Sequence, residues 1–180
     1  MNFLALDLEM NQPSKKIIEI GVVVGNVGDG IIFEQSWIID PLEPISEYIT
    51  ALTGIDDRLI KDSCVPLKQA RDEIADAQSR YGCYPNAVQW GKGDTDLLAK
   101  TLESSGIEPL RFGRRDLDVK TICVFQAISV GKKPKGGLSK YVAAHGLTFD
   151  GVPHRAAFDA RATLNLFFEL IRRERLRDNS

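Results

Sequence analysis

Two carboxylates interrupt an apolar run near the N-terminus, in the segment FLALDLEMNQ at residues 3–12. Side chains of a strand alternate between its two faces, so we expect Asp7 and Glu9 to lie side by side on one face. Both faces are apolar at first, which predicts a central strand covered on both sides. Unpaired carboxylates there cost on the order of several kcal/mol. The acidic pair therefore requires a compensating partner.

A second candidate group lies near the C-terminus, in PHRAAFDA at residues 153–160. Residues five apart on a helix differ in direction by about 140°, so His154 and Asp159 cannot share a helix face. Pro153 favours a loop at His154 and a helix that begins near Arg155. Asp159 then leans toward the interior, on the edge of the apolar stripe of that helix. It can converge on the strand's acidic pair.

Each candidate also has a purely structural interpretation. Asp94, which follows the apolar stretch NAVQWG, can be a helix N-cap after Gly93, and Asp159 can stabilise the positive end of a helix. His154 can be an ordinary loop histidine, and Glu9 can mark the end of its strand. Glu19, inside the apolar IIEIG, has no catalytic role that we can assign, so we expect a hydrogen-bonded core position. The presence of all these residues together is harder to explain by structural roles alone.

The elements that must position these residues follow from apolar periodicity. We expect strands at 16–26 and 30–40 that form a meander with the first strand, then short helical pieces over 46–79. A short strand at 86–91, a helix at 94–106 and another strand around 115–122 follow. Helices are expected at 138–146 and 155–177. This order predicts an α/β fold with a mixed sheet, antiparallel at first and parallel later, flanked by helices on both sides.

Composition limits the class of protein. The 180 residues are 43% hydrophobic and 27% charged, which fits a single domain over 1–180 with a sizeable core. A net charge of −2 gives no sign of a generally basic nucleic-acid or membrane binder, so any anionic partner must be held locally. The three cysteines are far apart, as expected of structural thiols in a reducing compartment. No segment approaches the ~20 apolar residues of a membrane span, so we expect no membrane partner and a cytoplasmic protein.

A set of motifs in order resembles one family. These are DLEMN at 7–11 with KKIIEIGVV behind it, LTGID at 52–56, WGKGDTDLL at 90–98, and GGLSKYVAAHGLTFDGVPHRAAFDARAT at 136–163. Together they resemble the DEDDh 3'-to-5' exonucleases of the DnaQ-like, ribonuclease-H-like superfamily, and most closely the Eri-type exoribonucleases. The resemblance spans nearly the whole chain. It implies a ribonuclease-H-like, five-stranded mixed sheet.

The resemblance also implies a catalytic set, which in this chain is Asp7, Glu9, Asp94, His154 and Asp159. In that family four carboxylates hold two divalent cations, Mg²⁺ or Mn²⁺, and the histidine is the general base, expected here in a mobile loop. We prefer Asp94 to Asp96 because the family's second aspartate is followed four residues later by an apolar helix position, here Leu98. After Glu9 the chain departs from many relatives, which carry Thr or Ala where Met10 and Asn11 stand. We assign these two residues to substrate binding.

The function implied by the resemblance is 3'-to-5' hydrolysis at single-stranded nucleic-acid 3' ends, with RNA favoured and nucleoside 5'-monophosphates released. A DNA-directed exonuclease and an oligoribonuclease are the alternatives within the family. A non-catalytic nucleic-acid-binding protein on the same fold is the alternative from another class, although a pure binder gains nothing from a repulsive acidic cluster. The basic segment GKKPKGG at 131–137 could follow a phosphate backbone or be a solvated linker.

Overall fold

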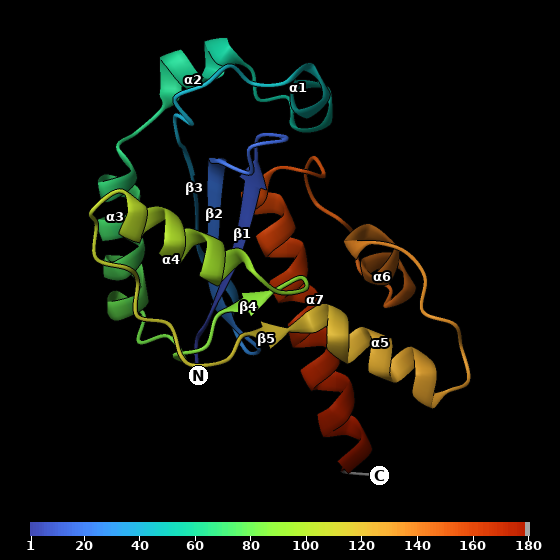
Figure 1. Cartoon of the computed structure of the whole chain (residues 1–180). Coiled ribbons are helices and arrows are strands. Elements are labelled where there is room, and N and C mark those ends of the chain that lie inside the picture. Colours follow the sequence, from blue (N-terminus) through green and yellow to red (C-terminus); the bar gives the residue numbers. More distant parts are fainter. Residues whose placement is uncertain (179–180) are drawn as a thin grey trace.

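A five-stranded sheet forms the centre of the protein, whose computed structural model describes residues 1–178 (Figure 1). Strands β1 (Phe3–Met10), β2 (Ile17–Asn26) and β3 (Gly30–Ile38) form the antiparallel meander, and the short β4 (Val88–Gln89) and β5 (Leu117–Asp118) run parallel to β1. The strand order is β3-β2-β1-β4-β5. The predicted mixed sheet, antiparallel first and parallel later, is confirmed.

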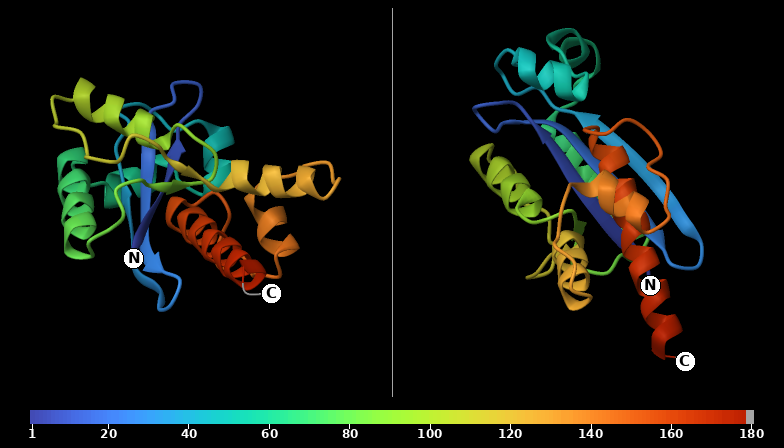
Figure 2. Two further views of the ribbon diagram at one scale, coloured as in Figure 1. Left: turned by 90° about the horizontal axis from the view of Figure 1, so that it is seen from below. Right: turned by 90° about the vertical axis from the view of Figure 1, so that its right-hand side faces the viewer.

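Helices cover both faces of this sheet, as Figure 1 and the two views of Figure 2 show. One face is covered by α3 (Leu67–Arg80) and α4 (Asp94–Ser104), and the other by α5 (Val119–Ser129), α6 (Leu138–Ala144) and α7 (Ala156–Asp178). Two short helices, α1 (Glu47–Thr53) and α2 (Asp57–Ser63), close one end of the molecule over a small apolar cluster of their own. No helix among residues 1–178 is both long and apolar enough to cross a bilayer.

The alternation of β1 divides its side chains between the two layers. Leu4, Leu6 and Leu8 belong to the apolar core beneath α3 and α4, whereas Ala5 belongs to the core beneath α7. Because β1 lies in the middle of the sheet, both sets are shielded from water. Asp7 and Glu9 continue the Ala5 side of the strand and so face the α7 layer, as the period of two predicted.

One expected strand is mostly a helix. The strand predicted around 115–122 is reduced to Leu117–Asp118, and α5 begins at Val119. The side chain of Asp118 accepts a hydrogen bond from the backbone N–H of Thr121 at 3.1 Å, which caps the helix. The β-branched residues after Asp118 favour a strand by propensity, but the cap and the burial of Val119 and Cys123 against α7 determine the outcome.

A glycine lets α7 approach the sheet closely. A Cβ atom at Gly21 would lie 2.2 Å from the carbonyl carbon of Ala156, so no other residue fits without moving the start of α7. Gly21 is the β2 partner of Asp7 in the antiparallel register. The first turn of α7 is therefore held against the strand pair that carries the acidic residues.

Candidate active site

Three segments that are distant in the sequence meet at the end of β1. The strand itself supplies Asp7 and Glu9, the turn after β4 leads to Asp94 at the start of α4, and the loop before α7 supplies His154. Asp159 follows in the first turn of α7. Figure 1 shows how the sheet brings the end of β1 next to the start of α7.

His154 and Asp159 form the part of the site that belongs to α7. As expected, His154 precedes the helix, with a φ of 62°, a left-handed conformation uncommon for a residue with a side chain. Its backbone N–H donates to Oδ2 of Asp159 at 3.3 Å. One ligand atom from each of Glu9, His154 and Asp159 lies within 4.8 Å of the others. The strand, the loop and the helix thus bring two oxygen ligand atoms and one nitrogen close together.

Asp94, rather than Asp96, faces this group. Gly93 is the N-cap of α4, with a φ of 115°, and Asp94 is the first helical residue, so the N-cap interpretation of Asp94 is wrong. Its backbone N–H donates to Oε1 of Gln89 at 3.1 Å. After removal from water, the charge of Asp94 is the largest cause of the raised pKa of Asp7. Asp96 is exposed.

The clustered carboxylates have raised pKa values because burial and mutual repulsion outweigh the opposing effects of Arg155 on Glu9 and of His154 on Asp159. Removal from water, followed by repulsion from Asp94 and Asp159, raises the pKa of Asp7 well above its ordinary value. Removal from water and then repulsion from Asp159 raise the pKa of Glu9 to about 8. Burial raises the pKa of Asp94 to about 6, with a contribution from Asp116, and burial also raises that of Asp159. Such a cluster fits hard divalent cations, which prefer carboxylate oxygens.

The position of Glu19 was expected, but its partner could not be read from the sequence. Glu19 is 1% exposed and accepts two hydrogen bonds from Nε and one from Nη2 of Arg155, the shortest at 2.8 Å. It also accepts a hydrogen bond from the backbone N–H of Ala156 at 3.0 Å. This buried carboxylate therefore ties β2 to the first residue of α7.

A polar network holds the turn that carries Asp94. The buried side chain of Gln89 donates to Oγ1 of Thr95 at 3.2 Å, and this hydroxyl donates in turn to the carboxylate of Asp116 at 3.0 Å. Asp118 accepts a hydrogen bond from the N–H of Gly91 at 3.1 Å. A buried glutamine in a short apolar strand was the one sequence signal that could have revealed this network.

The two residues assigned to substrate binding lie in different environments. Asn11 is 2% exposed, and its side-chain amide donates to Glu43 at 2.8 Å and to the carbonyl of Pro44 at 3.0 Å. Its carbonyl oxygen accepts from the N–H of Ser46. The Asn11 side chain thus anchors the segment that leads into α1. Met10 lies at a register shift between β1 and β2. It is half-buried, so part of it is accessible to a ligand.

Comparisons with known proteins agree with this geometry. A family model described as RNase_T, an exonuclease, matches residues 4–167. The chain belongs to this exonuclease family. The resemblance to DnaQ-like exonucleases is therefore confirmed at the level of the family, and the expected enzyme class, an exonuclease, agrees with it. The narrower Eri-type assignment stays a prediction.

The similar proteins include larger ones. DNA polymerase III PolC-type from Caldanaerobacter subterraneus subsp. tengcongensis is 27% identical over 176 residues, which cover 94% of this chain but only 11% of the polymerase. Cell-death related nuclease 4 (CRN-4) is 18% identical with a TM-score of 0.80, over 95% of this chain and 64% of that one. The nuclease domain of 3'hExo, a DEDDh family member bound to rAMP, is 14% identical with a TM-score of 0.75, over 95% and 92%. These structural likenesses show a shared fold.

Proposed function

We propose that the chain removes nucleotides one at a time from single-stranded 3' ends, with RNA favoured, and releases nucleoside 5'-monophosphates. The observation that carries the proposal is the convergence of Glu9, His154 and Asp159 beside Asp7 and Asp94. A binding protein would gain nothing from burying carboxylates that repel one another. One exonuclease domain then accounts for the chain.

The acidic cluster suits two divalent cations, Mg²⁺ or Mn²⁺. Asp94, Asp159 and Glu9 all act on Asp7 by repulsion, and these four carboxylates would together hold the ions. When bound, such ions supply charge stabilisation to the attacking and leaving oxygens of a phosphodiester. The protein's own contribution is the fixed placement of these carboxylates by the end of β1, the polar network at Asp94 and the glycine-mediated contact of α7.

His154 is the group that we assign to proton removal from the attacking water. Its side chain is exposed at the edge of the cluster, and a ring nitrogen lies within 4.8 Å of Glu9 and Asp159 oxygens. An imidazole can accept a proton from water near neutral pH, which suits it to this task. We expect His154→Ala to lower kcat by about 10² to 10⁴.

The chain's other histidine provides the control. His145 lies at the end of α6, where its ring is hydrogen-bonded to the carbonyl of Tyr141 at 2.8 Å. At saturating substrate and metal, His145→Ala should leave kcat within about twofold. An unchanged kcat in His154→Ala would remove this residue from the mechanism.

Digestion of end-labelled oligonucleotides tests the function. With Mg²⁺ or Mn²⁺, RNA with a free 3' hydroxyl should shorten stepwise, and chelator should stop the reaction. A 3' phosphate should block it, because it places negative charge where a hydroxyl is expected, whereas a 5' modification should have no effect. Cleavage of a circular strand would instead indicate an endonuclease, and no shortening with either metal would indicate a non-catalytic binder.

The same assay separates the alternatives within the family. The polymerase relative acts in DNA synthesis by its name, and the 3'hExo structure contains a ribonucleotide, so DNA and RNA of one sequence should be compared side by side. Faster DNA digestion would favour the DNA-directed enzyme, and a strict preference for very short RNA would favour an oligoribonuclease. The cysteines, Cys64, Cys83 and Cys123, are free thiols, which is compatible with the cytoplasmic setting that we propose.

A further inference from the structure

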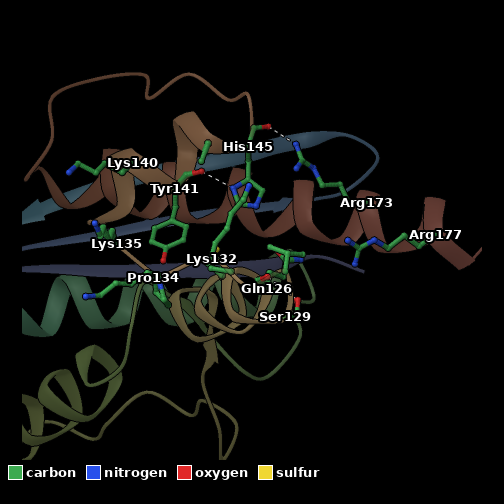
Figure 3. A pocket seen from close by; sticks show the side chains of 15 residues that line it. Gln126, Ser129, Lys132, Pro134, Lys135, Lys140, Tyr141, His145, Arg173 and Arg177 are labelled. Carbon is green, nitrogen blue, oxygen red and sulfur yellow. Dashed lines mark hydrogen bonds between the residues drawn. The ribbon is translucent and has the colours of Figure 1, made fainter.

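A basic groove lies between α5, α6 and the C-terminal half of α7 (Figure 3). Its volume is about 360 Å³, and no aspartate or glutamate is among the residues that line it. Its lining includes six lysine and arginine side chains: Lys132, Lys133, Lys135, Lys140, Arg173 and Arg177. A protein with a net charge of −2 thus gathers positive charge at one place.

The lysines of this groove are available to a ligand. All four are exposed, and within residues 1–178 none of their ammonium groups has a hydrogen-bond or ion-pair partner. Arg173 differs, because it donates to Glu169 at 2.7 Å and to the carbonyl of His145 at 2.8 Å. It braces α6 against α7 and forms part of the wall. The free positive charge therefore comes from the 131–140 segment.

The arrangement of the cations indicates the shape of the ligand. In Figure 3 the labelled cationic side chains extend across the groove from Lys140 at one side to Arg177 at the other and do not converge on one point. A single phosphate or small anion is usually held by donors that converge. Charges spread along a groove match a linear polyanion with a repeating phosphate.

The groove adjoins the candidate active site through an aromatic contact. Tyr141 lines the groove, and the centre of its ring lies 5.4 Å from that of Trp90. Trp90 stands four residues before Asp94 in the turn that carries this carboxylate. The chain after α6 also continues directly into the loop that bears His154. A strand whose end lies at the acidic cluster could thus extend toward the groove.

We propose that this groove binds the backbone phosphates of the substrate strand on the 5' side of the nucleotide that is removed. The inference rests on the proposed function, since a 3' end at the acidic cluster leaves only the 5' portion of the strand to reach the lysines. It resolves the two interpretations of GKKPKGG in favour of phosphate contact. The groove then favours long substrates over short ones.

The test combines substrate length with removal of three charges. In the variant Lys132→Gln/Lys135→Gln/Lys140→Gln, KM for a 20-nucleotide single strand should rise at least about tenfold. KM and kcat for a trinucleotide, which is too short to span both sites, should stay within about twofold. The dependence of log affinity on log salt should become shallower by on the order of 2, because each phosphate of a single strand that a lysine neutralises adds about 0.7 to the slope.

A matched control removes three charges elsewhere. The control lysines, Lys61, Lys68 and Lys100, are exposed on α2, α3 and α4, away from the groove. The variant Lys61→Gln/Lys68→Gln/Lys100→Gln should change neither the KM for the 20-nucleotide strand nor the KM for the trinucleotide. Thermal melts should show that both triple variants fold. Equal KM values for groove variant, control and wild type would overturn the proposal, as would equal losses on long and short substrates.

Binding in chelator separates this proposal from the catalytic one. Fluorescence anisotropy of a labelled 20-nucleotide strand that cannot be cleaved should show affinity that falls in the groove variant and not in the control. If the wild type binds in this way but degrades no nucleic acid, the proposed function is wrong, while the groove is still shown to bind the phosphates of a strand. If wild type degrades nucleic acid and the groove variant binds and cleaves long strands normally, the groove proposal fails alone.

Discussion

Two glutamates that face each other across β1 and β2 have opposite surroundings. Glu9 and Glu19 are direct partners in the antiparallel register and lie on the same side of the sheet. Glu19 is sealed inside and paired with Arg155, whereas Glu9 has neighbours of its own sign and a pKa raised to about 8. Arg155 forms a direct ion pair with Glu19, whereas its effect on Glu9 is too weak to offset burial and repulsion there.

This difference separates a structural acid from a functional one. Burying a charge pair costs desolvation free energy. Once the pair has formed, however, removal of one member is strongly destabilising, because it leaves an uncompensated buried charge. An uncompensated acidic cluster is instead unfavourable until cations from solution join it. We therefore expect Glu19 to have a structural role and Glu9 to take part in the proposed metal binding. Substitution at either position should reveal which role applies.

The largest effect is expected from the acidic cluster. Asp7→Asn and Glu9→Gln should each reduce kcat by about 10² to 10³ or more, because each removes a ligand for the ions that stabilise the reacting phosphate. In chelator neither variant should melt below wild type, since each relieves repulsion. Clear destabilisation of both variants in chelator would mean that these carboxylates are structural, as Glu19 is.

The next largest effect is expected at Arg155, which is the internal counterion. Arg155→Met should lower the free energy of unfolding by about 3 kcal/mol, because it leaves Glu19 buried without its guanidinium. Urea denaturation measures this change. Arg161→Met is the control: it breaks the pair with Glu34, whose carboxylate is more exposed than that of Glu19, and should cost about 1 kcal/mol. Equal losses would show that the two pairs do not differ.

The stability of the metal-free protein should depend on pH because of the acidic cluster. With folded-state pKa values raised at Asp7, Glu9 and Asp94, the folded protein binds more protons than the unfolded chain between about pH 5 and pH 8. The stability that these groups contribute is therefore present at low pH and is lost as pH rises through this window. Melting temperatures measured in chelator should fall accordingly.

Substitution of one carboxylate sharpens this test. Glu9→Gln should flatten the decline of melting temperature between about pH 5 and pH 8, whereas Glu103→Gln, at an exposed position on α4, should leave it unchanged. Saturating Mg²⁺ or Mn²⁺ should also flatten the decline, because bound cations favour the charged carboxylates. A melting temperature that rises with pH in chelator would contradict the raised pKa values.

The smallest effect is expected at Asp96. It lies two residues after Asp94 but is exposed, so Asp96→Asn should keep kcat and KM within about twofold of wild type. Asp94→Asn should lower kcat by at least about 10². A larger loss of kcat in Asp96→Asn than in Asp94→Asn would show that Asp96, and not Asp94, is the catalytic carboxylate.

Much of the fold and the position of the acidic pair followed from short-range patterns. The period of two in β1 correctly separated Leu6 from Asp7, and Pro153 correctly placed His154 before the last helix. The start of α5 did not follow, because Val119, Thr121 and Ile122 favour a strand locally and only the cap at Asp118 and packing against α7 make them helical.

Contacts between residues that are far apart in the sequence could not be predicted either. The buried position of Glu19 could be predicted from its apolar neighbours. Its partner, Arg155, is 136 residues away at a helix start, and no local feature of the sequence identifies it. Likewise Asn11 is followed by turn residues that suggest a surface, and only the path of the 43–46 segment shows that its side chain is enclosed. Such contacts depend on the route of the chain and not on its local composition.

The contact between Gly21 and Ala156 has a consequence for the time at which the protein becomes active during its synthesis. Asp7 and Glu9 leave the ribosome first, but Asp159 can join them only after the start of α7 has emerged and docked on β2. A nascent chain that has already formed its sheet still lacks a complete acidic cluster. The complete acidic cluster therefore forms only late in synthesis, when the start of the last helix has docked on the sheet.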